Sequence, residues 1–285
     1  MNISSTNRNP LKTIPSFLKQ NESSSDAEED NNPRLNSIPA NKNAEENQSI
    51  KNSSKKKILL KLSGEILSGN SGFGYDMPTI HHITKQIKEV VDAGHKISIV
   101  VGGGNICRGS TMSDAGMSRT PADHMGMLAT VINAIMLQNV LEKLSLEVRI
   151  MSAIDINDVC EPFIFKRALK HLSKDRVIIF AAGIGNPFFS TDTAAVLRAT
   201  ELQYDELIKG TKVDGIYDKD PLKFKDAIKY KSIHYQDILS KGLKVMDMAA
   251  VALAEENKLR IKVFSILRDS LMDVINETAP FSLVN

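Results

Sequence analysis

Short apolar segments alternate with amphipathic segments from residue 57 to the end of the chain. The apolar segments predict strands at 58–62, 97–101, 148–151, 177–181, 207–209 and 261–264. Helical spacing of apolar residues predicts helices at 76–93, 125–144, 247–257 and 271–276, and two more that begin near Pro162 and after Thr191. A strand-then-helix order of this kind predicts a three-layer αβα sandwich around a mostly parallel twisted sheet.

Two of the predicted helices carry further information. Asp76 can cap the helix at 76–93, and Gly94 can end it. The helix at 125–144 is apolar on most of its sides, so we expect it to be buried. No uninterrupted apolar run approaches the roughly 18 residues that a membrane span needs, so we expect no membrane partner.

The first 54 residues differ in composition from the rest of the chain. They contain 10 Ser, 11 Asn and four of the ten Pro. Such a segment cannot bury enough apolar surface to offset the loss of chain entropy, which predicts a disordered N-terminal extension over 1–54. The remaining residues, 55–285, are expected to form one domain.

Charge and cysteine content narrow the function classes. The net charge is +2 at pH 7, which is too close to neutral to indicate a nucleic-acid partner. The two cysteines, Cys107 and Cys160, form no CxxC pair, which argues against a disulfide framework or a structural zinc site. This cysteine usage is typical of a reducing compartment, so we expect a cytoplasmic protein.

The candidate chemistry lies in loops that follow predicted strands, where ligands bind in open parallel sheets. The segment 61–64 (Lys-Leu-Ser-Gly) offers an ammonium group for phosphate oxygens, although a surface lysine before a turn has the same sequence. The segment 102–105 (Gly-Gly-Gly-Asn), followed by Arg108, offers backbone N–H groups and a guanidinium fork for an anion. A flexible loop is the alternative for this second segment.

Two further loops add polar groups. The loop at 183–192 enters a helix whose first residues offer N–H groups and hydroxyls to an anion. Asp192 there has the position of a helix cap, and Phe188 and Phe189 are of a type found more often in a core than as stacking platforms. The loop at 209–221 holds lysines, a threonine, a tyrosine and carboxylates, which suit either a nucleoside triphosphate or a solvated hairpin.

Together the four loops predict phosphoryl transfer by an α/β enzyme. The chain contains no GxxxxGK[ST] sequence, which excludes a P-loop nucleotide kinase. No Ser/His/Asp triad or metal-ligand cluster suggests a different chemistry. The residues alone do not identify the acceptor of the phosphoryl group.

Five segments resemble the bacterial uridylate kinases, a group within the amino-acid-kinase superfamily. They are 61–64, 102–105, 123–130 (Asp-His-Met-Gly-Met-Leu-Ala-Thr), 185–189 (Gly-Asn-Pro-Phe-Phe) and 212–215 (Lys-Val-Asp-Gly). The first two occur across the superfamily, whereas 123–130 and 185–189 are far more specific to the uridylate branch. The resemblance extends from about residue 57 to the C-terminus, and it implies transfer of the γ-phosphoryl group of ATP to UMP.

The resemblance also implies binding roles for individual residues. ATP would be bound by Lys61, Leu62, Ser63, Gly64, Gly104, Arg108, Thr211, Tyr217 and Asp220. UMP would be bound by Gly103, Asp123, Ile184, Gly185, Asn186, Pro187, Phe188, Phe189, Ser190 and Thr191. A GTP effector would be bound by Gly69, Asn70, Ser71, Gly72, Phe73 and Gly74.

Four residues are expected to serve the reaction itself: Lys61, Arg108, Asp192 and Lys212. Lys61 would act with Mg²⁺ on the transferring phosphoryl group, and Lys212 and Arg108 would assist. Asp192 would orient a lysine or a hydrated magnesium ion, or it would only cap its helix. No general base is required, because UMP is largely dianionic at pH 7.

A cofactor and partners follow from the same resemblance. Mg²⁺ would arrive with ATP rather than at a metal site of the protein, GTP and UTP would act as effectors, and the chain would form a homohexamer. The chain departs from the family at Ile184, where threonine is usual, so any phosphate contact from that side chain is lost. Two other functions compete: a superfamily kinase that phosphorylates a carboxylate or carbamate, and a non-catalytic nucleotide sensor.

Overall fold

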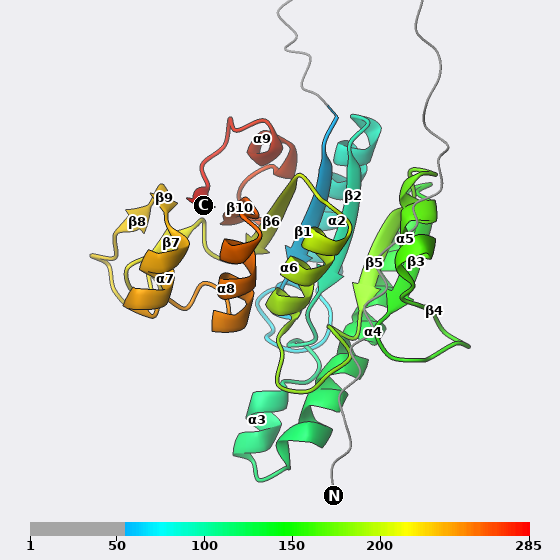
Figure 1. The fold of residues 1–285 in the computed structure, drawn as a ribbon, viewed down its shortest axis with the longest axis horizontal. Helices are drawn as coiled ribbons and strands as arrows, with labels where there is room; N and C mark the ends of the chain where they lie inside the picture. Colours follow the sequence, from blue (N-terminus) through cyan, green and yellow to red (C-terminus); the bar gives the residue numbers. More distant parts are fainter. Residues whose placement is uncertain (1–54) are drawn as a thin grey trace, which may run out of the picture. The chain divides into compact units, whose positions relative to one another are not determined.

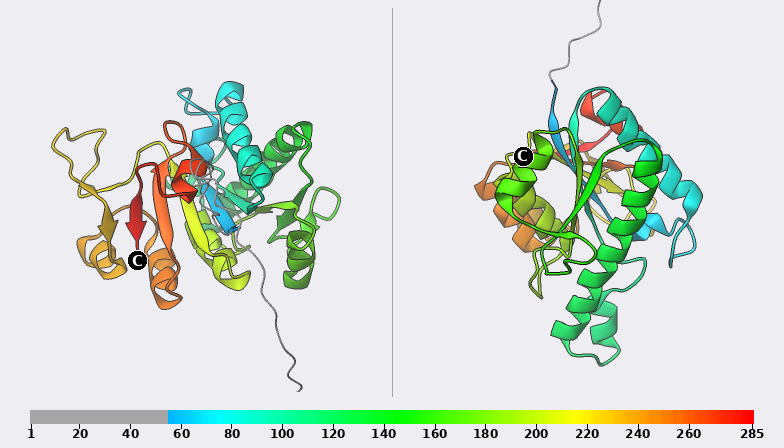
Figure 2. Two further views of the ribbon diagram at one scale, coloured as in Figure 1. Left: turned by 90° about the horizontal axis from the view of Figure 1, so that it is seen from above. Right: turned by 90° about the vertical axis from the view of Figure 1, so that its right-hand side faces the viewer.

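The central element of the structure is a nine-stranded sheet with helices on both of its faces (Figures 1 and 2). This computed structural model describes residues 55–285, and the extension expected over 1–54 lies outside the described residues. The sheet consists of β1 (Lys57–Leu62), β2 (Lys96–Val101), β3 (Val148–Ser152), β4 (Glu161–Pro162), β5 (Val177–Ala181), β6 (Glu206–Thr211), β9 (Ser232–Ile233), β10 (Ile261–Ser265) and β11 (Ser282–Val284). A separate hairpin consists of β7 (Ile216–Tyr217) and β8 (Lys229–Tyr230).

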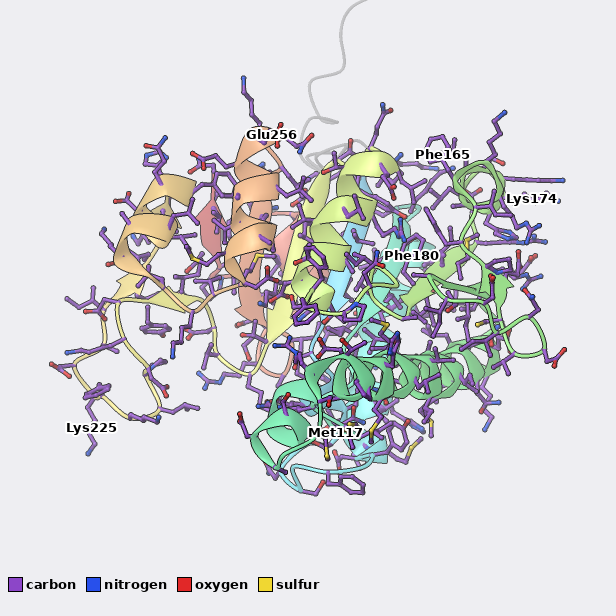
Figure 3. All side chains as sticks on the ribbon, turned by 60° about the horizontal axis from the view of Figure 1, so that its bottom comes forward. Met117, Phe165, Lys174, Phe180, Lys225 and Glu256 are labelled. Atoms are coloured by element: carbon purple, nitrogen blue, oxygen red, sulfur yellow. The ribbon has the colours of Figure 1, made fainter. Side chains whose placement is uncertain are left out.

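Nine helices connect these strands within the described part of the chain. They are α1 (Gly64–Leu67), α2 (Met77–Asp92), α3 (Gly109–Asp114), α4 (Arg119–Lys143), α5 (Phe165–Leu172), α6 (Thr191–Glu201), α7 (Tyr235–Lys241), α8 (Met248–Glu256) and α9 (Leu271–Ile275). The loop of the β7–β8 hairpin, marked by Lys225, and the turn between α3 and α4, marked by Met117, are seen in Figure 3.

The sheet is mostly parallel, as predicted. Its strand order is β4-β3-β5-β2-β1-β6-β10-β11-β9, and all neighbouring strands pair in parallel except β10 and β11. The carboxyl ends of β1, β2, β5, β6 and β10 therefore share one edge. This edge is where a ligand is expected in an open parallel sheet.

Alternating side chains along the strands build a separate core on each face of the sheet. On β1, Leu60 and Leu62 belong to a core with buried residues of α2, α4 and α9. Leu59 points the opposite way, into a core with buried residues of α6 and α8. The helices on the two faces are seen in the left view of Figure 2, and the predicted three-layer αβα sandwich is confirmed.

The six predicted strands and the six predicted helices are all present. Asp76 caps α2 as expected, because its carboxylate accepts a hydrogen bond from the Thr79 N–H at 3.0 Å. The strands β4, β9 and β11 and the helices α1, α3 and α7 were not predicted. Strands of two or three residues are too short to show a period of two, and α5 begins at Phe165 because β4 occupies the residues near Pro162.

Helix α4 differs from its prediction in both start and burial. It begins at Arg119 rather than at 125, and only part of it packs against the sheet. A stripe of apolar side chains on α4 is 40 to 49% exposed: Met125, Leu128, Ile132 and Ile135. By length and mean hydropathy, α4 is long and apolar enough to cross a membrane, which the search for uninterrupted apolar runs did not indicate. Half of this apolar stretch is buried inside the structure, as in a core helix.

Two glycines allow the loops at the carboxyl edge to approach one another. A Cβ atom on Gly64 would lie 2.6 Å from the backbone O of Gly102. A Cβ atom on Gly103 would lie 2.8 Å from both the Cβ of Ala129 and the backbone O of Gly126 on α4. Both distances are too short for any side chain, so glycine is needed for packing here rather than for flexibility.

We expect Gly103→Ala to lower the free energy of unfolding by roughly 1–3 kcal/mol, because the added methyl group would have to displace helix backbone. Gly104→Ala is the matched control, since the nearest atoms to its methyl group would belong to the side chains of Glu65 and Arg108, at 3.3 to 3.4 Å. Urea unfolding of both variants measures the difference. Equal losses in the two variants would show that close packing at Gly103 is unimportant.

Candidate active site

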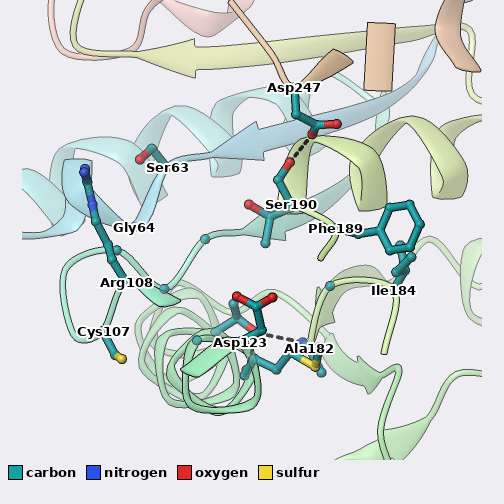
Figure 4. A pocket seen from close by; sticks show the side chains of 18 of the residues that line it. Ser63, Gly64, Cys107, Arg108, Asp123, Ala182, Ile184, Phe189, Ser190 and Asp247 are labelled. Carbon is teal, nitrogen blue, oxygen red and sulfur yellow. Dashed lines mark hydrogen bonds between the residues drawn. The ribbon is translucent and has the colours of Figure 1, made fainter. Parts of the chain in front are cut away.

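A cavity of about 470 Å³ lies at the carboxyl edge of the sheet (Figure 4). It is enclosed by the loops that follow β1, β2 and β5 and by the first turns of α4 and α6. The residues of its lining that were expected to bind ATP or UMP are Lys61, Ser63, Gly64, Gly103, Gly104, Arg108, Asp123, Ile184, Asn186, Phe188, Phe189, Ser190 and Thr191. Segments that are distant in the sequence therefore meet at one cavity.

Two lysines and one aspartate form a buried charged cluster beside this cavity. Lys61 on β1 and Lys209 on β6 are register partners on neighbouring parallel strands, so their side chains lie on the same face of the sheet. Asp192, in the first turn of α6, contacts both ammonium groups at 2.7 Å. Lys61 lines the cavity, whereas Lys209 is outside the lining and also donates to the backbone O of Val245.

The cluster shifts the protonation of its members. Burial raises the pKa of Asp192, but the positive charges of Lys61 and Lys209 outweigh burial and lower this pKa to about 2. Burial lowers the pKa of Lys209 to about 8, although the charge of Asp192 opposes that shift. Asp192 is therefore a carboxylate at neutral pH and is unsuited to accept a proton during catalysis.

The two lysines meet Asp192 in different ways. Lys209 donates a hydrogen bond to Oδ2 of Asp192 at 2.7 Å. Oδ1 is in contact with the Lys61 ammonium but accepts no aligned hydrogen bond from the described residues. The N–H groups of Lys61 are therefore available to an anion in the cavity.

The N-terminus of α6 is capped by Ser190 and not by Asp192, so the capping interpretation of Asp192 is wrong. The Ser190 Oγ accepts hydrogen bonds from the N–H groups of Asp192 at 2.9 Å and Thr193 at 3.4 Å. Ser190 Oγ–H in turn donates to the carboxylate of Asp247, as does Thr193 Oγ1–H at 2.9 Å. Asp247 thereby fastens the start of α6 to the start of α8 (Figure 4).

On the opposite side of the cavity, Asp123 organises the first turn of α4. Its carboxylate accepts a bifurcated hydrogen bond from Nε–H of Arg119, with both oxygens at 2.8 Å, and a hydrogen bond from the N–H of Phe188 at 2.8 Å. Burial raises the pKa of Asp123, but these hydrogen bonds outweigh burial, and the pKa lies below its ordinary value. The Arg119 guanidinium also lies 5.4 Å from the ring centre of Phe188.

The two phenylalanines of the third loop are surface residues of the cavity. Phe188 is 67% exposed and Phe189 is 49% exposed, so their expected place in the core is wrong. Phe188 also has a positive φ of 72°, which is uncommon for an aromatic residue and indicates local backbone strain. Exposed aromatic rings that line a cavity are suited to contact a ligand rather than to stabilise the fold.

The backbone of the third loop is compact and tied to α4. Ala182 and Gly185 have φ values of 61° and 85°, and a Cβ on Gly185 would lie 2.6 Å from the backbone O of Ala153. The N–H of Ala182 donates to Thr130 Oγ1 on α4 at 2.6 Å. Ile184 lines the cavity, but its side chain offers no hydrogen bond, as expected for isoleucine in place of the usual threonine.

Several predicted residues lie outside this cavity. The Leu62 side chain is fully buried in a core, which leaves only its backbone for contact with ATP. Gly185 and Pro187 are also outside the lining. Tyr217 donates to Asp214 at 2.7 Å, and the Asp220 carboxylate accepts a hydrogen bond within its own loop. Thr211 ends β6, and its hydroxyl donates to the backbone O of Val213.

Lys212 lines a second cavity, of about 310 Å³, next to the first. Its lining is Glu65, Gly72, Gly104, Ile106, Cys107, Arg108, Met112 and Lys212. Of the predicted effector segment 69–74, Gly72 belongs to this lining, and the backbone O of Gly69 accepts a hydrogen bond from Lys212 at 3.1 Å. Arg108, which is ion-paired with Glu65, is shared by both cavities.

Sequence reasoning missed three residues of the site. Lys209 was treated as one lysine of a polar loop, because its partnership with Lys61 depends on strand register. Asp247 carried only the signal of a helix start. Arg119 lay outside the predicted helix, although its spacing of four from Asp123 is the spacing of a helical ion pair.

Comparison with known proteins identifies the family. The sequence profile of the amino acid kinase family matches residues 56–265. The chain therefore belongs to the amino acid kinase family. Uridylate kinase of Rickettsia bellii is 55% identical over 211 residues, which are 74% of this chain and 88% of that protein. Uridylate kinase of Xanthomonas campestris pv. campestris is 53% identical with the same coverage.

Solved structures give the same result for the fold. A UMP kinase from Bacillus anthracis superposes with a TM-score of 0.76 and 38% identity, covering 81% of this chain and 96% of that chain. A UMP kinase from Ureaplasma parvum has a TM-score of 0.76 and 35% identity, covering 81% and 99%. The resemblance to the uridylate kinases that the sequence motifs indicated is confirmed.

The lowered pKa of Lys209 predicts how activity depends on pH. We expect kcat/KM for ATP to fall as the pH rises through about 8, because Lys209 then loses the charge that balances Asp192. Steady-state rates between pH 6 and about 10 measure this fall in kcat/KM. Lys209→Arg is the control: its charge persists across this range, so a folded variant should not show the fall. A parent profile that is flat to about pH 9.5 would exclude a role for the Lys209 charge.

Proposed function

We propose that this chain is a uridylate kinase, which transfers the γ-phosphoryl group of ATP to UMP and yields ADP and UDP. The observation that carries the proposal is the position of the two segments most specific to the uridylate branch. Asp123 of the first segment and Phe188 of the second are joined by a 2.8 Å hydrogen bond, and both line the cavity beside Lys61. This pairing brings the two branch-specific segments together at the cavity.

The donor nucleotide is assigned to the loops after β1, β2 and β6. Lys61, Ser63, Gly64, Gly104 and Arg108 provide positive charge and backbone N–H groups for its phosphates. Thr211, Tyr217 and Asp220 are assigned to its nucleoside. Lys212 would reach the phosphates from the second cavity, at the cost of its hydrogen bond to Gly69.

The acceptor is assigned to the other half of the cavity. Asp123 is a carboxylate suited to accept hydrogen bonds from ribose or base, and Phe188 and Phe189 offer exposed rings. Asn186, Ser190 and Thr191, from the segment that leads into α6, provide polar groups, and Gly103 of the loop after β2 is assigned to the acceptor as well. Gly185 and Pro187 would shape this loop, and Ile184 would contribute only through its backbone and apolar surface.

The reaction then needs positioning and positive charge rather than a base. A phosphate oxygen of UMP attacks the γ-phosphorus, and the bond from that phosphorus to the β–γ bridging oxygen breaks with its electron pair on ADP. Lys61 would stabilise the charge on the transferring group. Asp192 would hold Lys61 and Lys209 in place, since its own pKa of about 2 excludes it as a base.

A magnesium ion is proposed to arrive with ATP. Within residues 55–285, no three His, Cys, Asp or Glu side chains converge on one point. The carboxylates of the cavity are engaged with Arg108, Arg119 or the hydroxyls of α6, which suits an ion held by phosphate oxygens and water. The ion would neutralise charge between the phosphates.

Assembly and regulation are proposed from the family resemblance. The exposed apolar stripe on α4 (Met125, Leu128, Ile132 and Ile135) is suited to bury against another copy of the chain in a homohexamer. The segment 69–74, with Phe73 71% exposed, is proposed to bind GTP, and UTP is proposed as a second effector. Cys107 and Cys160 are free thiols, which supports a cytoplasmic location, and residues 1–54 are proposed to be dispensable for the reaction.

A coupled ADP-release assay with UMP, CMP and small carboxylates tests the proposed function. We expect kcat/KM for UMP to exceed that for CMP by at least about 10²-fold, because a site that pairs one base edge leaves polar groups unpaired with another. A faster reaction with a carboxylate would instead favour a different kinase of this superfamily. ATP binding without any ADP release would favour a nucleotide sensor.

A further inference from the structure

Two asparagines form a buried amide pair beneath the glycine-rich loop after β2. Asn105 ends that loop, Asn133 lies on α4, and neither side chain is exposed to solvent. Nδ2 of Asn133 donates to Oδ1 of Asn105 at 2.7 Å, and Nδ2 of Asn105 donates back to Oδ1 of Asn133 at 3.1 Å. Neither residue lines the cavity, so the pair cannot touch a substrate directly.

The remaining hydrogen-bonding capacity of this pair is used at two other places, Gly102 and the adjacent residues Gly74 and Tyr75. Asn133 Nδ2 donates to the backbone O of Gly102 at 2.7 Å, and Tyr75 Oη–H donates to Asn133 Oδ1 at 2.9 Å. Asn105 Nδ2 donates to the backbone O of Gly74 at 2.9 Å, and Gly74 N–H donates to the backbone O of Asn105 at 2.9 Å. Every polar atom of the two amides therefore has a partner, which favours a single arrangement of the loop.

The same helix also holds the loop on the acceptor side. Thr130, three residues before Asn133 and so on the same face of α4, accepts the hydrogen bond from Ala182 N–H at 2.6 Å. Asp123, at the start of α4, holds Phe188 N–H. Helix α4 is thus bonded to the donor loop through Asn133 and to the acceptor loop through Thr130 and Asp123.

We infer that Asn133 is a positioning residue for phosphoryl transfer. It fixes the position of the donor loop at 102–105 relative to the acceptor loop, because both loops are hydrogen-bonded to α4. The inference rests on the proposed function. In-line transfer requires the two phosphates to meet within a narrow range of distance, and a misplacement of about 1 Å can cost about 10²-fold in rate. Tyr75 and Gly74 extend the same network to the end of the segment 69–74.

Asn133→Ala tests the inference, with Thr84→Val as the matched control. Thr84 is equally buried, and its hydroxyl donates only to backbone O atoms of its own helix, α2. We expect Asn133→Ala to lower kcat with UMP by about 30- to 100-fold, in line with a displaced loop, and to leave the UMP Kd within about threefold. The control should lose thermal stability and keep kcat within about twofold.

A second readout does not depend on catalysis. Hydrogen exchange of the amides at 102–106 should accelerate in Asn133→Ala and stay unchanged in Thr84→Val. If Asn133→Ala does not fold, Tyr75→Phe, which removes only the donor to Asn133 Oδ1, should still accelerate exchange at 102–106 and lower kcat at least about threefold.

The outcomes separate the inference from the proposed function. A parent enzyme that does not phosphorylate UMP removes the proposed function, and the exchange measurement alone then decides the role of Asn133. A folded Asn133→Ala with unchanged exchange at 102–106 and parental kcat overturns the inference and leaves the proposed function intact. Loss of activity only in proportion to the unfolded fraction also overturns it, since that is the behaviour of a residue needed for stability alone.

Discussion

The contact of Asp192 with two lysines is the constraint on which the rest of the site depends. Strand register places the ammonium groups of Lys61 and Lys209 side by side, where they would repel each other in a buried environment. The carboxylate of Asp192 resolves that conflict, with a 2.7 Å contact to each lysine. Three buried charges add little to the free energy of unfolding, because an apolar cluster of similar size would stabilise the fold as well or better. The arrangement is best explained by the need for a fixed positive charge at the cavity.

The loops around this cluster depend on one another. Ser190 caps α6 and so sets the position of Asp192, while Asp247 holds Ser190 and Thr193 from the start of α8. On the other side of the cavity, α4 carries the groups that hold the loops after β2 and β5. Substrate phosphates would therefore meet preformed groups, and little reorganisation would be needed when charge develops on the transferring group.

The sequence predicted the layers of the fold better than the contacts of the site. Apolar segments such as 58–62 and 97–101 have the length and composition of buried strands, and the Asp76 cap depends only on local geometry. The three residues of β11 have no readable period, since that strand depends on pairing with β10. Lys209 was equally hidden, because its role follows from register with β1. The exposure of Phe188 could not be read from its type, since apolar residues at a ligand site resemble those of a core.

Kinetics of Lys61→Ala test the central claim, that a preorganised Lys61 acts on the transferring phosphoryl group. The variant should fold, because Asp192 and Lys209 remain as a neutral pair. The measurement is kcat together with the UMP Kd of the folded variant. We predict that kcat falls by about 10²–10³-fold while the UMP Kd changes little, since a positive donor aimed at the transition state acts on the rate and not on acceptor binding. A kcat within about fivefold of the parent, as expected for a weak exposed charge, would contradict the account.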